Sequence, residues 1–181
     1  MAGPVNAIFA VGQHGEFAMS DGSLPWRTSA SLRSDALQDM EHFKSITKGS
    51  AIVMGFSTYR TLTRPLVGRL NVVIDRSAHN TPDVTALEAL AGEECFCFYP
   101  TLEAALGALH TLPVRVFLIG GKALFEHAFS RGLVDGVVYQ TVFDASFPQV
   151  AVYFSLPAGL ELVKSERVGS LAFCEYQAVR R

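Results

Sequence analysis

Short apolar runs alternate along the chain with segments of helical pattern. The runs are Val5–Val11, Ala51–Met54, Asn71–Ile74, Cys95–Tyr99, Val114–Ile119 and Val137–Val142, and the tail adds Glu161–Val168 and Ala172–Arg180. Continuous apolar runs of this length are typical of strands that are covered on both faces, as in a parallel sheet with helices packed against it.

Four segments between these runs have helical character: Ser34–Thr47, Ser57–Leu62, Thr101–Leu109 and Lys122–Phe129. Strands that alternate with helices predict βαβ units with right-handed crossovers. The last two strands have no helix between them, so we expect them to pair antiparallel at one edge. The polar stretch Ser77–Glu94 is expected to be a loop or a short helix.

The pattern therefore predicts an α/β fold with a mainly parallel central sheet, flanking helices and an antiparallel C-terminal edge. No internal repeat and no long linker divides the chain, so we expect one domain over residues 1–181. With 49% apolar residues, 18% charged residues and a net charge of -2, the composition argues against disorder. It also lacks the basic excess of a general nucleic-acid binder.

No apolar run reaches the roughly 18 residues of a membrane span, and the first residues do not read as a signal peptide. We expect a soluble, cytoplasmic protein that binds neither membranes nor nucleic acid. The three cysteines, Cys95, Cys97 and Cys174, do not form a disulfide framework, and buried thiols are the favoured interpretation. The histidines are scattered along the chain, so we expect no metal site.

Asp39 is the first candidate for chemistry. At about 100° per residue, Ala36, Phe43 and Ile46 fall within roughly 60° of it, which places the carboxylate on an apolar arc of its helix. Such a carboxylate is costly to bury unless something pairs with it. Either Asp39 bridges to a neighbouring backbone group or arginine, or it lies in a ligand pocket where burial raises its pKa.

Three further signals also leave alternatives open. Gly120-Gly121 follows an apolar strand and opens a helix, which suits either a phosphate site or a tightly packed turn. Arg64 and Arg69 flank a Pro/Gly turn, where each guanidinium is either solvated or able to bind a carboxylate in a bidentate fork. Trp26, the only tryptophan, is either a core residue or the wall of a pocket beside a flexible loop.

The order of these motifs resembles the dihydrofolate reductase family over nearly the whole chain. The matching segments are Ala7–Val11, Leu24-Pro25-Trp26, Asp39-Met40-x-x-Phe43-Lys44 with Thr47, Ile52-Val53-Met54-Gly55-x-x-Thr58-Tyr59, Arg64-Pro65-Leu66-x-Gly68-Arg69-x-Asn71, Ile119-Gly120-Gly121 and Thr141. Singly these are common peptides, but seven of them in family order are specific.

The resemblance implies hydride transfer from NADPH to C6 of 7,8-dihydrofolate, giving tetrahydrofolate, by a cytoplasmic monomer that serves one-carbon metabolism. It implies that Asp39 binds N3 and the 2-amino group of the pterin and that the Thr141 hydroxyl steadies the Asp39 carboxyl. It also implies that Trp26 belongs with these two among the catalytic residues. It places Arg69 on the carboxylate of the glutamate tail. The other substrate-side residues that it implies are Ile8, Met40, Phe43, Leu62, Arg64 and Ile119.

On the cofactor side, the resemblance implies that the glycine pair, usually joined by a cis peptide in the family, lies at the pyrophosphate. The implied cofactor-binding residues are Ala10, Phe17, Met19, Ser23, Gly55, Ser57, Thr58, Arg76, Gly120, Gly121, Lys122, Ala123, Leu124 and Phe125.

The chain departs from the family pattern at several points. About eight extra residues lie between Trp26 and Asp39, Phe56 stands where many members have Arg or Lys, and Asp75 stands where the family has Ser. Because only Arg76 remains as an evident partner for the 2′-phosphate, we expect a narrow preference for NADPH over NADH.

Two departures concern the last third of the chain. The Phe147–Ser155 segment lacks the acidic residue that usually steadies the loop over the site, and the last hairpin is shortened around Gly169-Ser170. Two other functions remain open at this point. One is a reductase of the same fold that acts on a riboflavin-pathway pyrimidine, and the other is a folate- or nucleotide-binding relative that has lost turnover.

Overall fold

The apolar runs form strands in the computed structural model, which describes residues 3–179. The chain packs as two units, residues 3–7 with 47–134 and residues 8–46 with 135–179, and each is described by itself. Strand β1 (Val5–Val11) contributes residues to both units. The hydrogen-bonded order of the eight-stranded sheet is β5-β4-β3-β6-β1-β7-β10-β9.

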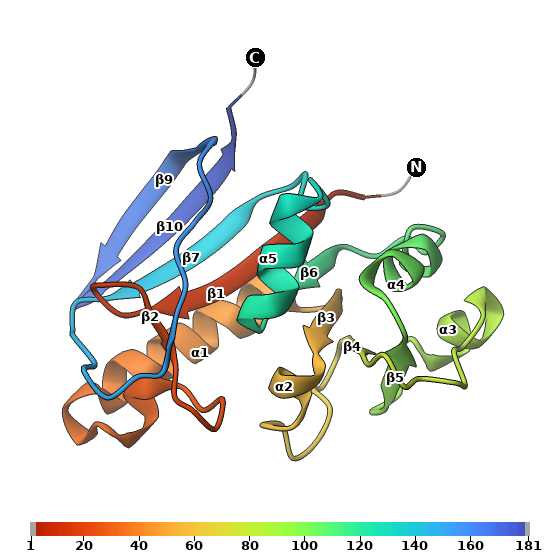
Figure 1. Cartoon of the computed structure of the whole chain (residues 1–181), viewed down its shortest axis with the longest axis horizontal. Helices are drawn as coiled ribbons and strands as arrows, with labels where there is room; N and C mark the ends of the chain where they lie inside the picture. Colours follow the sequence, from red (N-terminus) through yellow and green to blue (C-terminus); the bar gives the residue numbers. More distant parts are fainter. Residues whose placement is uncertain (1–2, 180–181) are drawn as a thin grey trace. The chain divides into compact units, whose positions relative to one another are not determined.

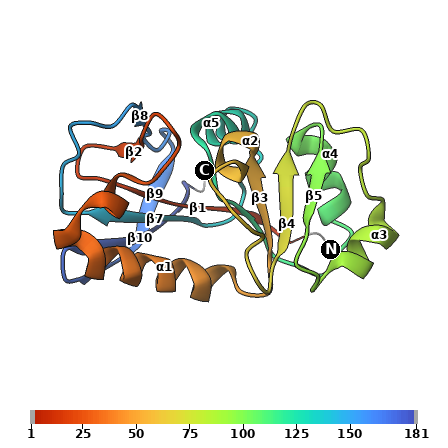
Figure 2. The same ribbon diagram turned by 90° about the horizontal axis from the view of Figure 1, so that it is seen from below.

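The first unit carries the parallel strands (Figure 2). These are β3 (Ala51–Gly55), β4 (Leu70–Ile74), β5 (Phe96–Tyr99) and β6 (Val116–Leu118), which pair in parallel with one another and with the start of β1. Ile52, Val53 and Met54 have no exposed surface, as expected for a strand that is covered on both faces.

Four helices belong to this unit: α2 (Phe56–Tyr59), α3 (Val84–Leu90), α4 (Leu102–Leu109) and α5 (Lys122–Ser130). Two of them start at side-chain caps, because the carboxylate of Asp83 accepts from the N–H of Ala86 and the hydroxyl of Thr101 accepts from the N–H of Ala104. Each cap satisfies one amide at a helix end that has no partner within the helix.

The second unit carries the antiparallel strands. β10 (Leu171–Ala178) pairs with both β7 (Val138–Phe143) and β9 (Leu160–Val168), and the three lie side by side in Figure 1. A separate two-stranded sheet joins β2 (Glu16–Ala18) to β8 (Val152–Tyr153). Helix α1 (Arg33–Thr47) follows two short 3-10 helices, η1 (Pro25–Thr28) and η2 (Ala30–Leu32).

An aromatic cluster forms the core of the second unit. Its buried members are Trp26, Phe143, Phe147, Val150 and Leu171. The indole of Trp26 stacks on the ring of Phe143 with centroids 4.2 Å apart, and the ring of Phe147 meets it edge-on at 5.8 Å. The cluster therefore ties η1 to β7 and to the segment that follows β7.

The structure confirms the predicted fold class, with a mainly parallel sheet and an antiparallel C-terminal edge. Several predicted bounds are wrong. The helix predicted for Ser57–Leu62 ends at Tyr59, Cys95 lies just before its strand, and the strand predicted for Val114–Ile119 is only Val116–Leu118. The end of the last predicted strand at Arg180 lies outside the described residues.

The polar stretch holds the short helix α3, one of the two structures expected for it. The 3-10 helices η1 and η2 and the strands β2 and β8 were missed because elements of two to four residues show no period. That the two units make one domain stays a prediction. None of the helices within residues 3–179 is both long and apolar enough to cross a membrane.

The aromatic cluster makes a stability prediction. Replacing Phe143, which has no exposed surface, by Ala should lower the free energy of unfolding by about 3–5 kcal/mol, because it removes a buried ring and leaves a cavity beside Trp26. Urea unfolding followed by circular dichroism measures the loss. Val163→Ala is the control: this β9 side chain is 47% exposed, so the change should cost less than about 0.5 kcal/mol. Equal losses in the two variants would contradict the assigned core.

Candidate functional site

Asp39 lies half-buried on α1 and accepts a hydrogen bond from the hydroxyl of Thr141, a buried residue of β7. Burial raises the pKa of Asp39 from 3.8 to about 6, although the hydrogen bond from Thr141 acts in the opposite direction. The sequence left open whether Asp39 bridges to a neighbouring backbone group or arginine or lies in a ligand pocket. The structure gives it a hydroxyl partner and a pKa raised by burial, and its place in a ligand pocket stays a prediction.

The apolar residues predicted around Asp39 differ in exposure. Ile8 in β1 is buried, Phe43 on α1 is half-buried, and Met40 on the same helix is 37% exposed. Trp26 is 2% exposed within the aromatic cluster, so the structure favours its interpretation as a core residue. Its place in the catalytic group stays a prediction.

The loop residues predicted to contact a cofactor surround β2. Phe17 lies in β2, and its ring is 6.3 Å from that of Phe9 and 5.8 Å from that of Phe154. Ala10 and Met19 pack against the aromatic cluster. The amide and hydroxyl of Ser23 both donate to Asp21, at 2.9 and 2.6 Å, so the end of this loop is a closed turn.

In the first unit, the structure brings five of the predicted cofactor residues together at the ends of β3 and β6. The peptide between Gly120 and Gly121 is cis, as the resemblance implies for the family. The amide of Gly55 donates to the carbonyl of Gly120 at 2.7 Å. A Cβ on Gly121 would lie 3.2 Å from the hydroxyl oxygen of Ser57 and 3.5 Å from that of Thr58.

The glycine pair leads directly into α5. Gly121 is the residue before the first turn and brings no side-chain cap, so backbone N–H groups define this helix end. Lys122 forms an ion pair with Glu126 at 3.6 Å, Ala123 is exposed, and Leu124 and Phe125 are buried beneath the turn. A helix N-terminus with this composition suits an anion.

The guanidinium of Arg69 is held by hydrogen bonds to neighbouring groups. Its Nε and Nη2 atoms donate to the carbonyl of Val67 at 3.0 and 2.9 Å, and its Nη1 donates to the hydroxyl of Thr47 at 3.2 Å. Arg64, the other arginine of the turn, is exposed. Leu62 and Ile119, the remaining substrate-side residues, are half-buried in the same unit.

The residues predicted to govern the 2′-phosphate lie at the ends of β3 and β4. Asp75 accepts from the amide and the hydroxyl of Ser77 at 2.9 and 2.8 Å, and these hydrogen bonds hold its pKa below 3.8. Arg76 is exposed, and Phe56 exposes 44% of its surface. Asp75 is therefore an ionised residue that also closes a turn, which the sequence did not indicate.

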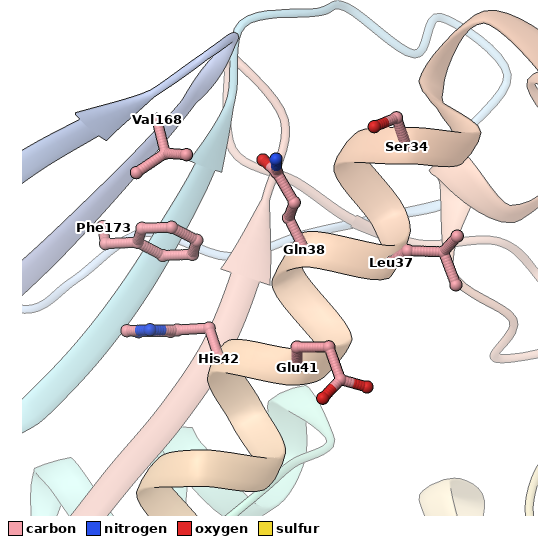
Figure 3. A pocket seen from close by; sticks show the side chains of 7 residues that line it. All are labelled: Ser34, Leu37, Gln38, Glu41, His42, Val168 and Phe173. Carbon is pink, nitrogen blue, oxygen red and sulfur yellow. The ribbon is translucent and has the colours of Figure 1, made fainter.

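The sequence also missed a groove beside α1, with a volume of about 400 Å³ (Figure 3). Its lining residues are Ser34, Leu37, Gln38, Glu41, His42, Val168 and Phe173. The ring of His42 stacks on that of Phe173 with centroids 3.9 Å apart. At 100° per residue, Leu37 and Glu41 point away from Asp39, whereas His42 lies about 60° from it. The groove depends on the packing of α1 against β9 and β10, for which the sequence carries no local signal.

The family model for dihydrofolate reductase matches residues 5–158. This chain belongs to the dihydrofolate reductase family. A type 3 dihydrofolate reductase of Salmonella typhimurium is 32% identical over 77% of the chain and 72% of the relative. Dihydrofolate reductase of Staphylococcus aureus is 27% identical over 70% of the chain and 64% of the relative.

Two further similarities are with a bifunctional enzyme and with a solved structure. A bifunctional dihydrofolate reductase-thymidylate synthase of Daucus carota is 33% identical, but the match covers 65% of this chain and only 22% of that protein. The solved structure of dihydrofolate reductase from Enterococcus faecalis, complexed with NADP(H) and RAB-propyl, superposes with a TM-score of 0.74. It covers 98% of both chains at 20% identity, so it supports the dihydrofolate reductase fold.

The raised pKa of Asp39 makes a prediction about stability. Between 3.8 and about 6 the folded state binds more protons at this carboxyl than the unfolded state, so the contribution of Asp39 to stability falls as the pH rises through that window. Asp39→Asn should therefore raise the free energy of unfolding at pH 7. A pKa displaced from 3.8 to about 6 sets an upper bound of about 3 kcal/mol on the gain.

Urea unfolding of wild type and Asp39→Asn at several pH values measures this difference, which should shrink as the pH falls toward 4. Glu41→Gln is the matched control on the same helix, since the Glu41 side chain is 73% exposed and pairs with Lys44 at the surface. A gain in Asp39→Asn that does not depend on pH would contradict the assigned burial.

Proposed function

We propose that this chain reduces 7,8-dihydrofolate to 5,6,7,8-tetrahydrofolate with NADPH as the reductant. The observation that carries the proposal is the Asp39 carboxyl, which is half-buried, hydrogen-bonded by a buried threonine and displaced in pKa to about 6. A carboxyl of this kind is typical of a ligand-binding site rather than of a solvated helix face.

Asp39 serves as the acceptor for the pterin. An ionised carboxylate offers two acceptor oxygens to the adjacent N–H groups of the pyrimidine ring, and the Thr141 hydroxyl orients it. A negative charge at this position favours the protonated pterin, so Asp39 promotes protonation at N5, with water as the immediate proton donor. Ile8, Met40 and Phe43 supply apolar surface, and Trp26 supports them from the core.

The glycine cradle fits NADPH. The close approach of Gly121 to Ser57 and Thr58 and the uncapped start of α5 suit backbone amides that bind a pyrophosphate, and a Cβ on Gly121 would crowd Ser57. The residues that would hold the cofactor here are Gly55, Ser57, Thr58 and Gly120 to Phe125. NADPH supplies the hydride, while the chain supplies binding and orientation.

Arg69 is the proposed partner of the carboxylate on the glutamate tail. Its planar guanidinium, which the Val67 carbonyl and the Thr47 hydroxyl hold in place, would offer charge-assisted donors to that carboxylate. Arg64, Leu62 and Ile119 complete the substrate side of this unit.

We further propose a cytoplasmic monomer that supplies tetrahydrofolate for one-carbon metabolism. The free thiols of Cys95, Cys97 and Cys174 suit a reducing compartment. The combination of Leu-Pro-Trp with a helix aspartate favours this function over a riboflavin-pathway reductase. NADPH absorbance followed with dihydrofolate present tests the function, and absence of turnover despite binding would instead support a non-catalytic relative.

Asp39→Asn tests the role of the carboxyl in catalysis. The variant keeps the shape but loses the charge, so kcat/KM for dihydrofolate at pH 7 should fall by at least about 100-fold, in the range typical of general acid–base groups. Activity should partly recover in acid, where the substrate arrives protonated. Steady-state rates from pH 5 to 8 measure this, with Glu41→Gln as the nearly silent control. Full activity of the Asn variant at pH 7 would reject the assignment.

The choice of cofactor depends on Arg76 and Asp75. One exposed charge-assisted contact should give only a modest preference for NADPH, because solvent screens it. In Arg76→Ala, the ratio of kcat/KM for NADPH to kcat/KM for NADH should fall close to one. Asp75→Asn should raise this ratio, because the amide oxygen still accepts from Ser77 while the negative charge is gone. An unchanged ratio in Arg76→Ala would mean that another group, such as His79, reads the phosphate.

A further inference from the structure

Glu16 is the only charged residue among the buried side chains of residues 3–179, with 2% of its surface exposed. It lies in β2, which pairs with β8 (Figure 2). The mechanism above does not use it. A buried carboxylate is costly unless its oxygens are satisfied, so its surroundings indicate what it does.

Three donors satisfy this carboxylate: one comes from the nearby residue His14, and two come from Ser146 and Phe147, which lie far away in the sequence. Oε2 accepts from the amide of His14 at 2.7 Å, while Oε1 accepts from the hydroxyl of Ser146 and the amide of Phe147, both at 3.1 Å. Burial by itself would raise the pKa of Glu16, but the hydrogen bonds from Phe147, His14 and Ser146 outweigh it, and the pKa lies below 4.5. Glu16 is therefore ionised at neutral pH.

The backbone around Glu16 is shaped to admit the carboxylate. A Cβ on Gly12 would lie 2.6 Å from Oε2 of Glu16 and 2.7 Å from the ring of Phe147, so only glycine fits there. The amide of Gly12 donates to the carbonyl of Glu16 at 2.8 Å, and the amide of Gln13 donates to the carbonyl of Ala145 at 2.9 Å. We call Gly12, Glu16, Ser146 and Phe147 the Glu16 clasp.

The clasp connects the loop to the aromatic cluster. Phe147, whose amide it engages, packs edge-on against Trp26. In the other direction, the chain continues from Glu16 into the loop that holds Phe17, Met19 and Ser23, the residues that the resemblance places on the cofactor. The nearest acid to the Ser146 and Phe147 donors along the chain, Asp144, pairs with Arg167 at 3.2 Å, so Glu16 supplies the carboxylate that these donors bind.

We propose that Glu16 is a positioning residue that holds the loop of residues 17–23 in its cofactor-binding arrangement through the Ser146 and Phe147 donors. This inference rests on the proposed function for the identity of the cofactor. Glu16 touches neither substrate nor reacting atoms in this assignment. It acts through β2, which contains Glu16 and leads directly into that loop.

Glu16→Gln tests the proposal. The amide keeps the size of the side chain, but it loses the charge and turns one acceptor into a donor that faces the N–H of His14 or Phe147. The Kd for NADPH, measured by calorimetry without substrate, should rise about tenfold, the loss expected for a charged hydrogen bond. The kcat should fall, while the KM for dihydrofolate should stay within about twofold. Ser146→Ala removes one donor and should give a smaller rise in Kd.

A control variant with a similar loss of stability distinguishes a positioning role from a merely structural one. Leu87→Ala removes a fully buried side chain in α3, which belongs to the other unit, and should lower the melting temperature without changing the Kd for NADPH. If Glu16→Gln lowers the melting temperature and leaves the Kd and kcat unchanged, the positioning role is wrong and the proposed function stands. If wild type binds NADPH but does not reduce dihydrofolate, the proposed function fails, and the Kd comparison still tests the clasp.

Discussion

The hydrogen bond from the Gly55 amide to the Gly120 carbonyl, 2.7 Å long, is the constraint on which the arrangement of the first unit depends. It joins the ends of two neighbouring parallel strands at the point where each leads into a helix. Parallel strands deliver their carboxyl ends to one edge of the sheet, so the starts of α2 and α5 meet there. A Cβ on Gly121 would lie 3.2 Å from the Ser57 hydroxyl oxygen, so a larger residue there would crowd this side chain.

Two acids of the second unit show how donors decide the state of a buried carboxyl. Asp39 receives a single hydroxyl hydrogen bond, and burial dominates, so its pKa rises to about 6. Glu16 exposes 2% of its surface, and two amides and a hydroxyl hold its pKa below 4.5. Glu16 is thus ionised at neutral pH and joins β2 to residues 146 and 147. Asp39, with one hydroxyl donor, is the carboxyl proposed to bind the pterin.

The sequence predicted the fold well where apolar runs were long. Strands such as Ala51–Gly55 are buried on both faces, and their composition alone separates them from helices. The short strands β2 and β8 could not be predicted, because two or three residues show no period and their pairing joins segments far apart in the chain. For the same reason no local pattern indicated that Glu16 is buried, since its donors Ser146 and Phe147 lie about 130 residues away.

The site was predictable in part. Helical periodicity placed Asp39 on an apolar arc, and the family motifs supplied the roles proposed for Arg69 and the glycine pair. No pattern showed that Asp75 closes a turn on Ser77 or that the ring of His42 stacks on Phe173, because these contacts depend on side-chain geometry. The resemblance also could not indicate how the extra residues before Asp39 fold, since the family pattern has no counterpart for them.

The anchoring of Arg69 has a consequence for the entropy of binding. A free arginine side chain loses about 2 kcal/mol of rotamer freedom when a ligand orders it. Here the Val67 carbonyl and the Thr47 hydroxyl already select one arrangement of the guanidinium, so most of that ordering takes place when the chain folds. In the role proposed for Arg69, a substrate carboxylate would meet a guanidinium that is already oriented, so little of its binding free energy would be lost to ordering this side chain.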